Sequence, residues 1–327
     1  MSFLGVSADA GSRVHVRVPI GSYPDGSPVE LPVAVIRGRQ PGPTLYLQAG
    51  LHGDEMTGID ICRRVLAALD PDQLSGTVVS VPLANPPAHR SRTRGAVNEE
   101  RGPIDANRVF PGSEGGLLTE RIVHTLFSEF VSHADLVLDL HSALDGCNIL
   151  PFVYIDPDDD TTGTLEARES AGRAFGTPYV YYKGRGQKLG TSDMSRALRS
   201  QADAAGIPSF SAEMGESRRV TAGYVPIGVR GVHNVLRHLG IEPGEVEAAE
   251  SQRDFRTITL LHANEGGALR WKADLGDEVS AGQPIAELVD LFGSVVETLA
   301  APVDGFILRK MLYGSIATGA EVVWIAS

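Results

Sequence analysis

The sequence predicts an α/β fold in which helices flank a mixed sheet, followed by a smaller β-rich C-terminal domain. Short apolar runs typical of buried strands alternate with longer segments whose apolar residues repeat at helical spacing. The 37 Gly and 20 Pro residues fall between these runs, which indicates brief strands and shaped loops. After residue 243 the helical spacing disappears and short strands with Gly turns replace it. We therefore expect two domains, residues 1–243 and 244–327.

The first predicted unit of the α/β domain is a strand at 44–49 followed by a helix that starts at Met56. This helix places Ile59, Cys62 and Val65 on one face. The same alternation continues along the chain, with strands predicted at 76–85, 134–142 and 207–215 and helices at 118–134, 191–206 and 226–240. Strands separated by helices favour a largely parallel or mixed sheet that is covered on its faces.

Charge and composition exclude several classes of function. The chain carries 29 Lys and Arg against 41 Asp and Glu, and its formal net charge of −12 repels a nucleic-acid backbone. No apolar run reaches the roughly 18 residues that a membrane span needs. Only Cys62 and Cys147 are present, and the first residues lack the pattern of a secretory signal. We expect a cytoplasmic protein without nucleic-acid or membrane partners, and the sequence does not specify an oligomeric state.

A candidate metal site begins with His52 and Glu55 in the segment AGLHGDEMTG, between a predicted strand and a predicted helix. A pair with this spacing also occurs on ordinary helix faces, but such a pair does not need the flanking Gly50 and Gly53. Imidazole and carboxylate ligands suit Zn²⁺, and a catalytic zinc takes three protein ligands. His141 ends the apolar strand LVLDLH, and neighbouring strand ends meet at one sheet edge. The sequence therefore predicts one Zn²⁺ per chain, bound by these three residues.

Candidate substrate-binding residues lie in a long loop between residues 85 and 112, which is rich in Gly, Pro, Asn and Arg. Asn107 and Arg108 together can bind a carboxylate, because a guanidinium offers a two-pronged donor and the amide adds another. Arg101 can polarise a carbonyl and stabilise an oxyanion. The remaining arginines of the loop are interpreted as a solvated cluster that offsets local acidic residues: Arg90, Arg92 and Arg94.

Glu213 is the candidate general base. It interrupts the end of the apolar strand in SFSAEMGE, just before a Gly turn. Metal-assisted hydrolysis needs a group that takes a proton from water and returns it to the leaving nitrogen, which a carboxylate near the metal can do. Glu216 is the nearby alternative, but it follows Gly215 and is expected further out on the loop.

These motifs, in this order, resemble the succinylglutamate desuccinylase/aspartoacylase family, which is related to the zinc carboxypeptidases. The family's G-x-H-G-x-E loop stands here as GLHGDE, its D-x-N-R-x-F-P-G stretch as DANRVFPG, and its D-L-H as residues 139–141. The resemblance implies a zinc-carboxypeptidase-like mixed sheet. It also implies roles for single residues: zinc ligands His52, Glu55 and His141, carboxylate contacts Asn107 and Arg108, carbonyl polariser Arg101, and catalytic Glu213. Ala106 stands where many relatives have Leu, a change of packing rather than of chemistry.

The C-terminal domain resembles a small β-barrel of the biotinyl/lipoyl type in the segments LGDEVSAGQPIAELVD and APVDGFIL. It lacks the exposed lysine turn that carries the swinging arm in such domains. We therefore expect a structural domain that covers or shapes the mouth of the main domain, not a carrier.

The resemblance and the residues together predict a zinc-dependent amidohydrolase. Its substrate would be a small anionic molecule, an N-acyl amino acid or a related amide that bears a carboxylate. Glu213 would take a proton from an activated water and return it to the leaving amine. Two alternatives remain: a metallocarboxypeptidase that acts on short peptides, and a zinc-binding protein without catalysis. The acyl group and the amine half of the substrate are not specified by the sequence.

Overall fold

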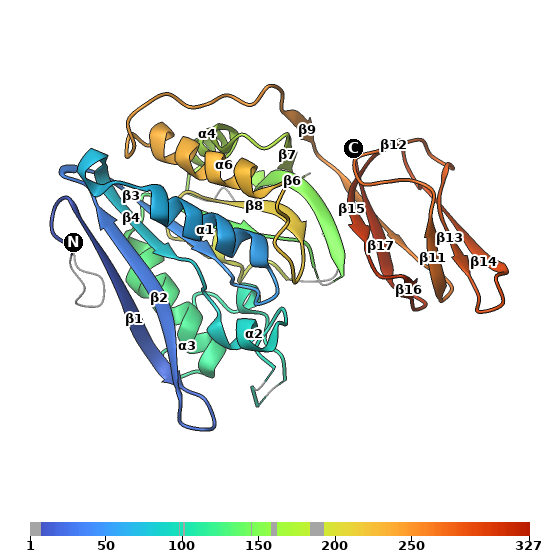
Figure 1. The fold of residues 1–327 in the computed structure, drawn as a ribbon, viewed down its shortest axis with the longest axis horizontal. Helices are drawn as coiled ribbons and strands as arrows, with labels where there is room; N and C mark the ends of the chain where they lie inside the picture. Colours follow the sequence, from blue (N-terminus) through green and yellow to red (C-terminus); the bar gives the residue numbers. More distant parts are fainter. Residues whose placement is uncertain (1–7, 98, 101, 145, 158–161, 184–192) are drawn as a thin grey trace.

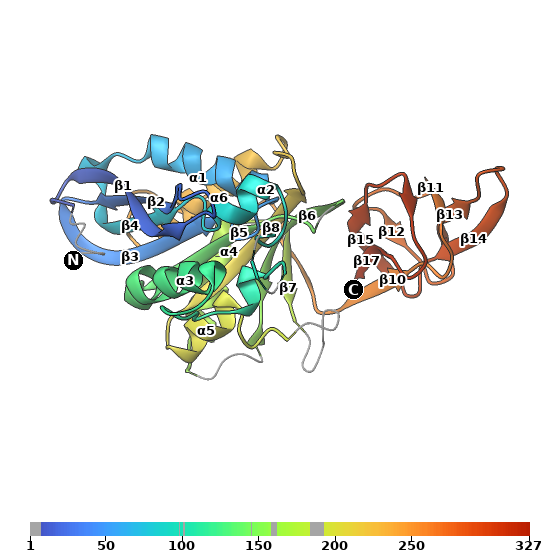
Figure 2. The same ribbon diagram turned by 90° about the horizontal axis from the view of Figure 1, so that it is seen from below.

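The computed structural model describes residues 8–97, 99–100, 102–144, 146–157, 162–183 and 193–327. Within these ranges, one long mixed sheet runs through the α/β part and continues into the C-terminal part (Figures 1 and 2). Its α/β portion has, in spatial order, β1 (Ser12–Ser22), β2 (Pro28–Arg37), β4 (Ser75–Val81), β3 (Gln40–Ala49), β5 (Leu136–His141), β8 (Ser209–Glu216) and β6 (Cys147–Ile155). The predicted mixed sheet with flanking helices is confirmed.

The centre of this sheet is parallel, and its register sets the functional edge. β3 pairs in parallel with both β4 and β5, and β5 pairs in parallel with β8. Ala49 stands beside Leu140, and His141 stands directly beside Glu213. The carboxyl ends of β3, β5 and β8 therefore lie side by side.

Three helices cover one face of the sheet: α1 (Met56–Ala68), α4 (Leu165–Phe175) and α6 (Val225–His238) (Figure 1). α1 buries Ile61, Cys62 and Val65, which share one helical face, against the apolar side chains of the central strands. α6 packs closely on α1 because Gly228 has no side chain there; a Cβ would lie 2.2 Å from Ile61 Cδ1.

The opposite face is covered by α3 (Leu118–Thr125) and α5 (Leu198–Ala204), which lie below the sheet in Figure 2. Their apolar residues form a second core with strands β1, β2 and β4. α3 continues into a π-helical turn at Leu126–Phe130 and a 3₁₀ turn at Val131–His133, so the helix predicted at 118–134 is not a regular α-helix throughout. The hairpin β1–β2, the strand β6 and the helix α4 were not predicted.

The C-terminal part holds the strands β9 (Arg253–Phe255), β10 (Ile258–His262), β11 (Gly267–Trp271), β12 (Glu278–Val279), β13 (Pro284–Val289), β14 (Val295–Ala300), β15 (Gly305–Met311), β16 (Ser315–Ile316) and β17 (Glu321–Ala326). β11, β13, β14 and β16 form a separate small sheet, and an apolar core joins it to β15 and β17. The barrel type stays a prediction. β15 pairs with β6, and β9 pairs with β7 (Tyr179–Tyr182), so hydrogen bonds connect the two parts; the boundary after residue 243 also stays a prediction.

Among the helices of the described residues, none is long and apolar enough to cross a membrane.

The loop after β3 is held against the short helix α2 (Pro86–Ser91). The Gly53 N–H donates to the Arg94 carbonyl at 3.4 Å, and the Gly53 carbonyl lies 3.2 Å from His89 Nδ1. A Cβ on Gly53 would lie 2.0 Å from the carbonyl carbon of Ala88, a backbone atom that cannot rotate away. This position therefore requires glycine, and it fixes the path of the loop that carries His52 and Glu55.

We expect Gly53→Ala to lower the free energy of unfolding by about 2 kcal/mol or more, because the added methyl group forces the loop off α2. Thermal and denaturant unfolding measure the effect. Gly115→Ala is the matched control, since a Cβ there meets nothing within 4 Å. Equal stability of the two variants would contradict the tight contact at Gly53.

Candidate metal and substrate site

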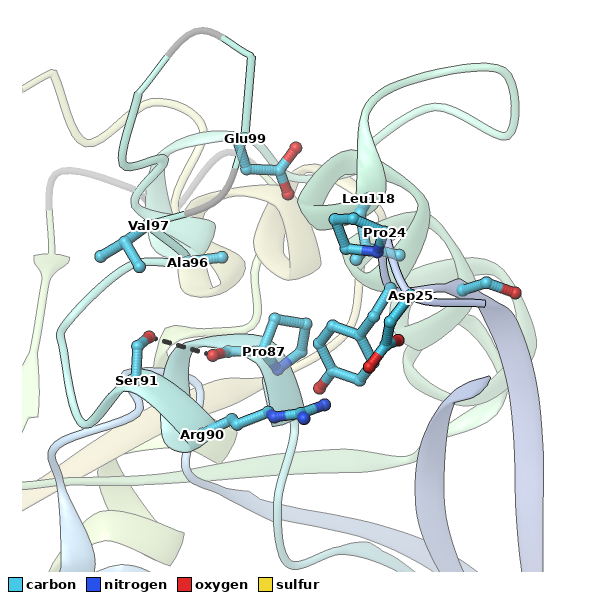
Figure 3. A pocket seen from close by; sticks show the side chains of 11 residues that line it. Pro24, Asp25, Pro87, Arg90, Ser91, Ala96, Val97, Glu99 and Leu118 are labelled. Carbon is cyan, nitrogen blue, oxygen red and sulfur yellow. Dashed lines mark hydrogen bonds between the residues drawn. The ribbon is translucent and has the colours of Figure 1, made fainter. Parts of the chain in front are cut away.

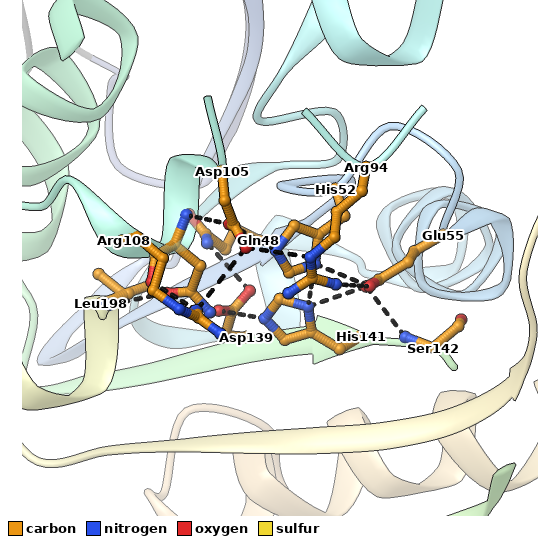
Figure 4. Close-up of polar contacts among 11 residues, drawn as sticks. Gln48, His52, Glu55, Arg94, Asp105, Arg108, Asp139, His141, Ser142 and Leu198 are labelled. Carbon is orange, nitrogen blue, oxygen red and sulfur yellow. Dashed lines mark hydrogen bonds and ion pairs between the residues drawn. The ribbon is translucent and has the colours of Figure 1, made fainter. Parts of the chain in front are cut away.

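Three predicted metal ligands meet at the carboxyl ends of the central strands. His52 and Glu55 lie in the loop between β3 and α1, and His141 is the last residue of β5. One ligand atom from each of these three buried residues lies within 4.8 Å of the others. His52 Nδ1 is 2.7 Å from Glu55 Oε1, and His141 Nδ1 is 2.8 Å from Glu55 Oε2 (Figure 4). The structure thus brings the predicted ligand set together.

Each histidine also contacts a carboxylate through its other ring nitrogen. His52 Nε2 lies 3.1 Å from Asp105 Oδ1, and His141 Nε2 lies 2.7 Å from Asp139 Oδ2. Asp139 is fixed in turn by Gln48, whose Nε2 donates to Asp139 Oδ1 at 2.9 Å. Carboxylate partners of this kind orient a ligating imidazole and fix which nitrogen carries the proton.

The tautomer that these carboxylates favour suits a bound cation. With the protons on Nε2 facing Asp105 and Asp139, the Nδ1 atoms of His52 and His141 keep their lone pairs, 3.2 Å apart. Two lone pairs cannot satisfy one another at that distance, whereas a cation shared with Glu55 satisfies both. Two imidazoles and one carboxylate form the donor set of a catalytic zinc site, so these residues fit Zn²⁺.

The electrostatic field at this point favours positive charge. Burial lowers the pKa of His141, but Asp139 and Glu55 raise it well above its ordinary value. Burial raises the pKa of Glu55, but the adjacent His52 and His141 outweigh it and hold that pKa well below its ordinary range. The Glu55 carboxylate is further fixed by the Ser142 N–H, which donates to Oε2 at 3.0 Å. The site is therefore preorganised to hold an ionised carboxylate and a positive charge.

Glu213 lies beside this cluster, directly across from His141 in the register of β8 and β5. Burial raises the pKa of Glu213 to about 7; His141 opposes the rise, and the negative charge of Glu55 adds to it. Among the described residues its carboxylate accepts no hydrogen bond, and it lines the same cavity as the three ligands. The alternative base, Glu216, forms an ion pair with Arg219 at 3.2 Å and is not among the described residues that line the cavity.

The loop between residues 85 and 112 contributes some of its predicted substrate-binding residues to the cavity. Asn107 and Arg108 line the cavity, as expected of substrate contacts. The Asn107 Oδ1 accepts from the Leu198 N–H at 2.9 Å. This contact leaves the Asn107 amide nitrogen as the donor of that side chain. Arg108 Nη1 donates to the Asn107 carbonyl at 2.8 Å. Arg101 lies outside the described residues.

Arg94 offsets acidic residues, as expected, but its interpretation as part of a solvated cluster is wrong, because it lines the cavity. Its Nε donates to Asp105 Oδ2 at 3.0 Å, and its Nη1 lies 3.4 Å from Glu55 Oε1 (Figure 4). Arg94 therefore holds two of the carboxylates around the candidate metal site. No periodic pattern marks it in the loop sequence, so only the folded loop reveals its position.

The cavity around these groups has a volume of about 360 Å³, which suits a small molecule. Its walls come from the metal cluster, from β6 and α5, and from the C-terminal strands β10, β15 and β17. The described residues that line it include Phe152, Tyr154, Arg199, Leu260, Arg309, Glu321 and Trp324. The C-terminal part thus forms one wall of the site, as predicted for a domain that shapes its mouth.

A second cavity of about 540 Å³ lies apart from this site (Figure 3). It is bounded by the β1–β2 turn, α2 and the start of α3, and Arg90 stacks over the Tyr23 ring with 4.5 Å between the guanidinium carbon and the ring centroid. Its described ionisable residues are Tyr23, Asp25, Arg90 and Glu99, which do not form a metal-ligand set. We therefore place the chemistry in the first cavity.

Some site residues could have been found in the sequence. Asp139 lies two residues before His141 on one strand, and side chains at that spacing point to the same face. Gln48 and Tyr46 have the same spacing on β3, and the Tyr46 hydroxyl donates to Gln48 Oε1 at 2.8 Å. Asp105 opens the DANR segment, where its Oδ1 accepts from the Asn107 N–H at 2.9 Å.

Comparison with known proteins agrees with this geometry. Residues 41–239 match the model of the succinylglutamate desuccinylase/aspartoacylase catalytic domain. The chain belongs to this family. The matched segment contains His52, Glu55, His141 and Glu213, and the predicted family resemblance is confirmed.

Individual members of the family match almost the whole chain. The N-alpha-acetyl-L-2,4-diaminobutyric acid deacetylase of Halomonas elongata is 29% identical over 98% of this chain and 92% of its own. The product-bound structure of the ectoine utilization protein EutE (DoeB) from Ruegeria pomeroyi is 26% identical, with a TM-score of 0.86 over 98% of this chain and 97% of that one. A succinylglutamate desuccinylase/aspartoacylase from Rhodobacter sphaeroides is also 26% identical, with a TM-score of 0.84 over 98% of each chain.

We expect Asp139→Asn to raise the dissociation constant for Zn²⁺ about 10- to 100-fold, because the His141 ring loses its charged partner. Competition with a chromophoric chelator measures the affinity. Asp60→Asn, on α1 and paired with Arg63 and Arg64, is the control. If Asp139→Asn binds zinc as tightly as that control, Asp139 does not support a metal ligand.

Proposed function

We propose that the protein is a zinc-dependent amidohydrolase that removes the acyl group from a small N-acyl amino acid. The observation that carries the proposal is the convergence of His52, Glu55 and His141 on one point, with the carboxylate of Glu213 across from His141. This arrangement supplies three ligands and a separate base, which together suffice for hydrolysis by an activated water.

The metal, when bound, would act as a Lewis acid toward the amide carbonyl and would lower the pKa of a water molecule. His52, Glu55 and His141 would hold it, and Asp105 and Asp139 would fix the two imidazoles. Glu213 would take the proton from water and deliver it to the departing nitrogen. A carboxyl group whose pKa burial raises to about 7 can accept and release a proton near neutral pH.

The rest of the cavity would bind the substrate. Asn107 and Arg108 would donate to a substrate carboxylate and so orient the scissile amide toward Glu213. Arg101 would polarise the carbonyl, as the family resemblance implies. The relative from Halomonas elongata, whose name describes the removal of an acetyl group from a diamino acid, supports an N-acyl amino acid as the substrate class.

The two alternatives have less support. A carboxypeptidase must admit a peptide chain, whereas Leu260 and Trp324 of the C-terminal strands wall one side of a cavity of about 360 Å³. A binding protein without catalysis has no need for a carboxylate beside the ligands, yet Glu213 lies in that position without a hydrogen-bond partner among the described residues.

We expect Glu213→Gln to lower kcat/KM for N-acyl amino acids by about 10²- to 10⁴-fold, because an amide cannot take the proton from water. Zinc content should stay at the wild-type level. Release of free amine measures turnover, and metal analysis measures the zinc. Glu216→Gln is the matched control and should retain activity within about threefold. Loss of activity in Glu216→Gln with retention in Glu213→Gln would reverse the assignment of the base.

We expect Arg108→Gln to lower kcat/KM about 10- to 100-fold on a carboxylate-bearing substrate, mainly through a higher KM, since it removes a charged hydrogen bond. When the substrate carboxylate is replaced by a carboxamide, Arg108→Gln should lower kcat/KM much less. Arg92→Gln, an exposed arginine of the same loop, serves as the control. An unchanged kcat/KM for the carboxylate substrate in Arg108→Gln would remove this residue from the binding site.

A further inference from the structure

The cavity wall contributed by the C-terminal part contains an ion pair whose arginine is buried. Arg309 of β15 and Glu321 of β17 both line the cavity, and Arg309 Nη2 donates to Glu321 Oε1. Trp324 contacts both partners: its indole N–H donates to Glu321 Oε1, and the Arg309 guanidinium carbon lies 4.3 Å from the centroid of its ring. Trp324, which lies on the same strand as Glu321, therefore holds both partners in position.

Arg309 has unused donors. Its side chain is 2% exposed, and its Nε and Nη1 have no hydrogen-bond partner among the described residues. Buried donors of a charged group cost free energy when they are left without an acceptor, and native proteins rarely leave them so. A ligand oxygen in the adjoining cavity would supply the acceptor.

Glu321 has an unused acceptor. Its side chain is 26% exposed, and Oε1 receives both hydrogen bonds described above. No hydrogen bond within the described ranges reaches Oε2, although His262 Nε2 lies 3.9 Å away. The other carboxylates that line the cavity are Glu55, Asp105 and Glu213, which belong to the metal site. Glu321 is thus the acidic group in the described lining that remains available to a substrate.

A ligand that complements this pair carries an oxygen acceptor for Arg309 and, close to it, a cationic donor for Glu321. We propose that Arg309 and Glu321 form a specificity subsite for a mono-N-acylated diamino acid, with the substrate carboxylate on Arg309 alongside Arg108 and the unacylated ammonium on Glu321. The inference rests on the proposed function and deepens it, because it assigns the second amine of the substrate to the C-terminal wall. Trp324 is a positioning residue that holds both charges in place.

The decisive experiment compares two substrates that differ in one group. Nα-acetyl-2,4-diaminobutyrate carries an ammonium where Nα-acetylnorvaline carries a methyl group of similar size. We expect the wild-type protein to prefer the first by about tenfold or more in kcat/KM, because a charge-assisted hydrogen bond forms only with the ammonium. In Glu321→Gln this preference should fall to near unity, because kcat/KM falls more for the diaminobutyrate derivative than for the norvaline derivative.

Glu321→Gln keeps an oxygen that accepts from Arg309 and Trp324, so the wall should keep its shape. Glu278→Gln is the matched control, since Glu278 pairs with Arg253 on the same part of the chain and its side chain is 66% exposed. We expect Arg309→Gln to raise KM for both substrates and to leave zinc content unchanged. A wild-type protein that does not distinguish the substrates, or a Glu321→Gln variant that loses activity on both equally, would overturn the subsite.

Failure of the proposed function would look different. If the zinc-loaded wild type hydrolyses neither substrate, calorimetric binding of 2,4-diaminobutyrate and of norvaline still tests the subsite. Preferential binding of the diamino acid that Glu321→Gln abolishes would support the subsite without the deacylase activity. Equal binding of both amino acids would overturn the subsite as well.

Discussion

The parallel register of β3, β5 and β8 is the constraint on which the site depends. Leu138 at the centre of β5 stands beside Leu47 of β3 and Phe210 of β8, and all three side chains are fully buried. This apolar packing fixes the register, because a slip of one residue would turn buried side chains toward the wrong face. The same slip would carry His141 away from both His52 and Glu213.

Charge balance is the second constraint at this edge of the sheet. Glu55, Asp105 and Asp139 are gathered around two imidazoles in a largely buried space, and Glu213 stands beside them. Arg94 offsets part of this negative charge through its contacts with Glu55 and Asp105. The carboxylates of Asp139 and Glu55, which raise the pKa of His141, create a negative potential at this point. Arginines in the cavity lining give an anionic substrate a local attraction within a protein of net charge −12.

The sequence predicted the residues whose position follows from local structure. His52, Glu55, His141 and Glu213 lie at or just after strand ends, and parallel strands bring such ends together. Asp139 follows from the period of two along β5, although the prediction did not use it. Arg94 and the pair Arg309–Glu321 could not be predicted in this way. Arg94 depends on the path of a loop without periodicity, and the pair depends on β15 joining β6, more than 150 residues earlier in the chain.

The proposed function requires one zinc ion, held at His52, Glu55 and His141, for amide hydrolysis. Zinc titration into chelator-stripped protein, followed by release of free amine from N-acyl amino acids, tests it most directly. We expect activity to rise with added zinc and to stop rising at one equivalent per chain, and we expect a His141→Ala variant to stay inactive over the same titration. Full activity in the stripped protein, or a zinc response that His141→Ala retains, would contradict it.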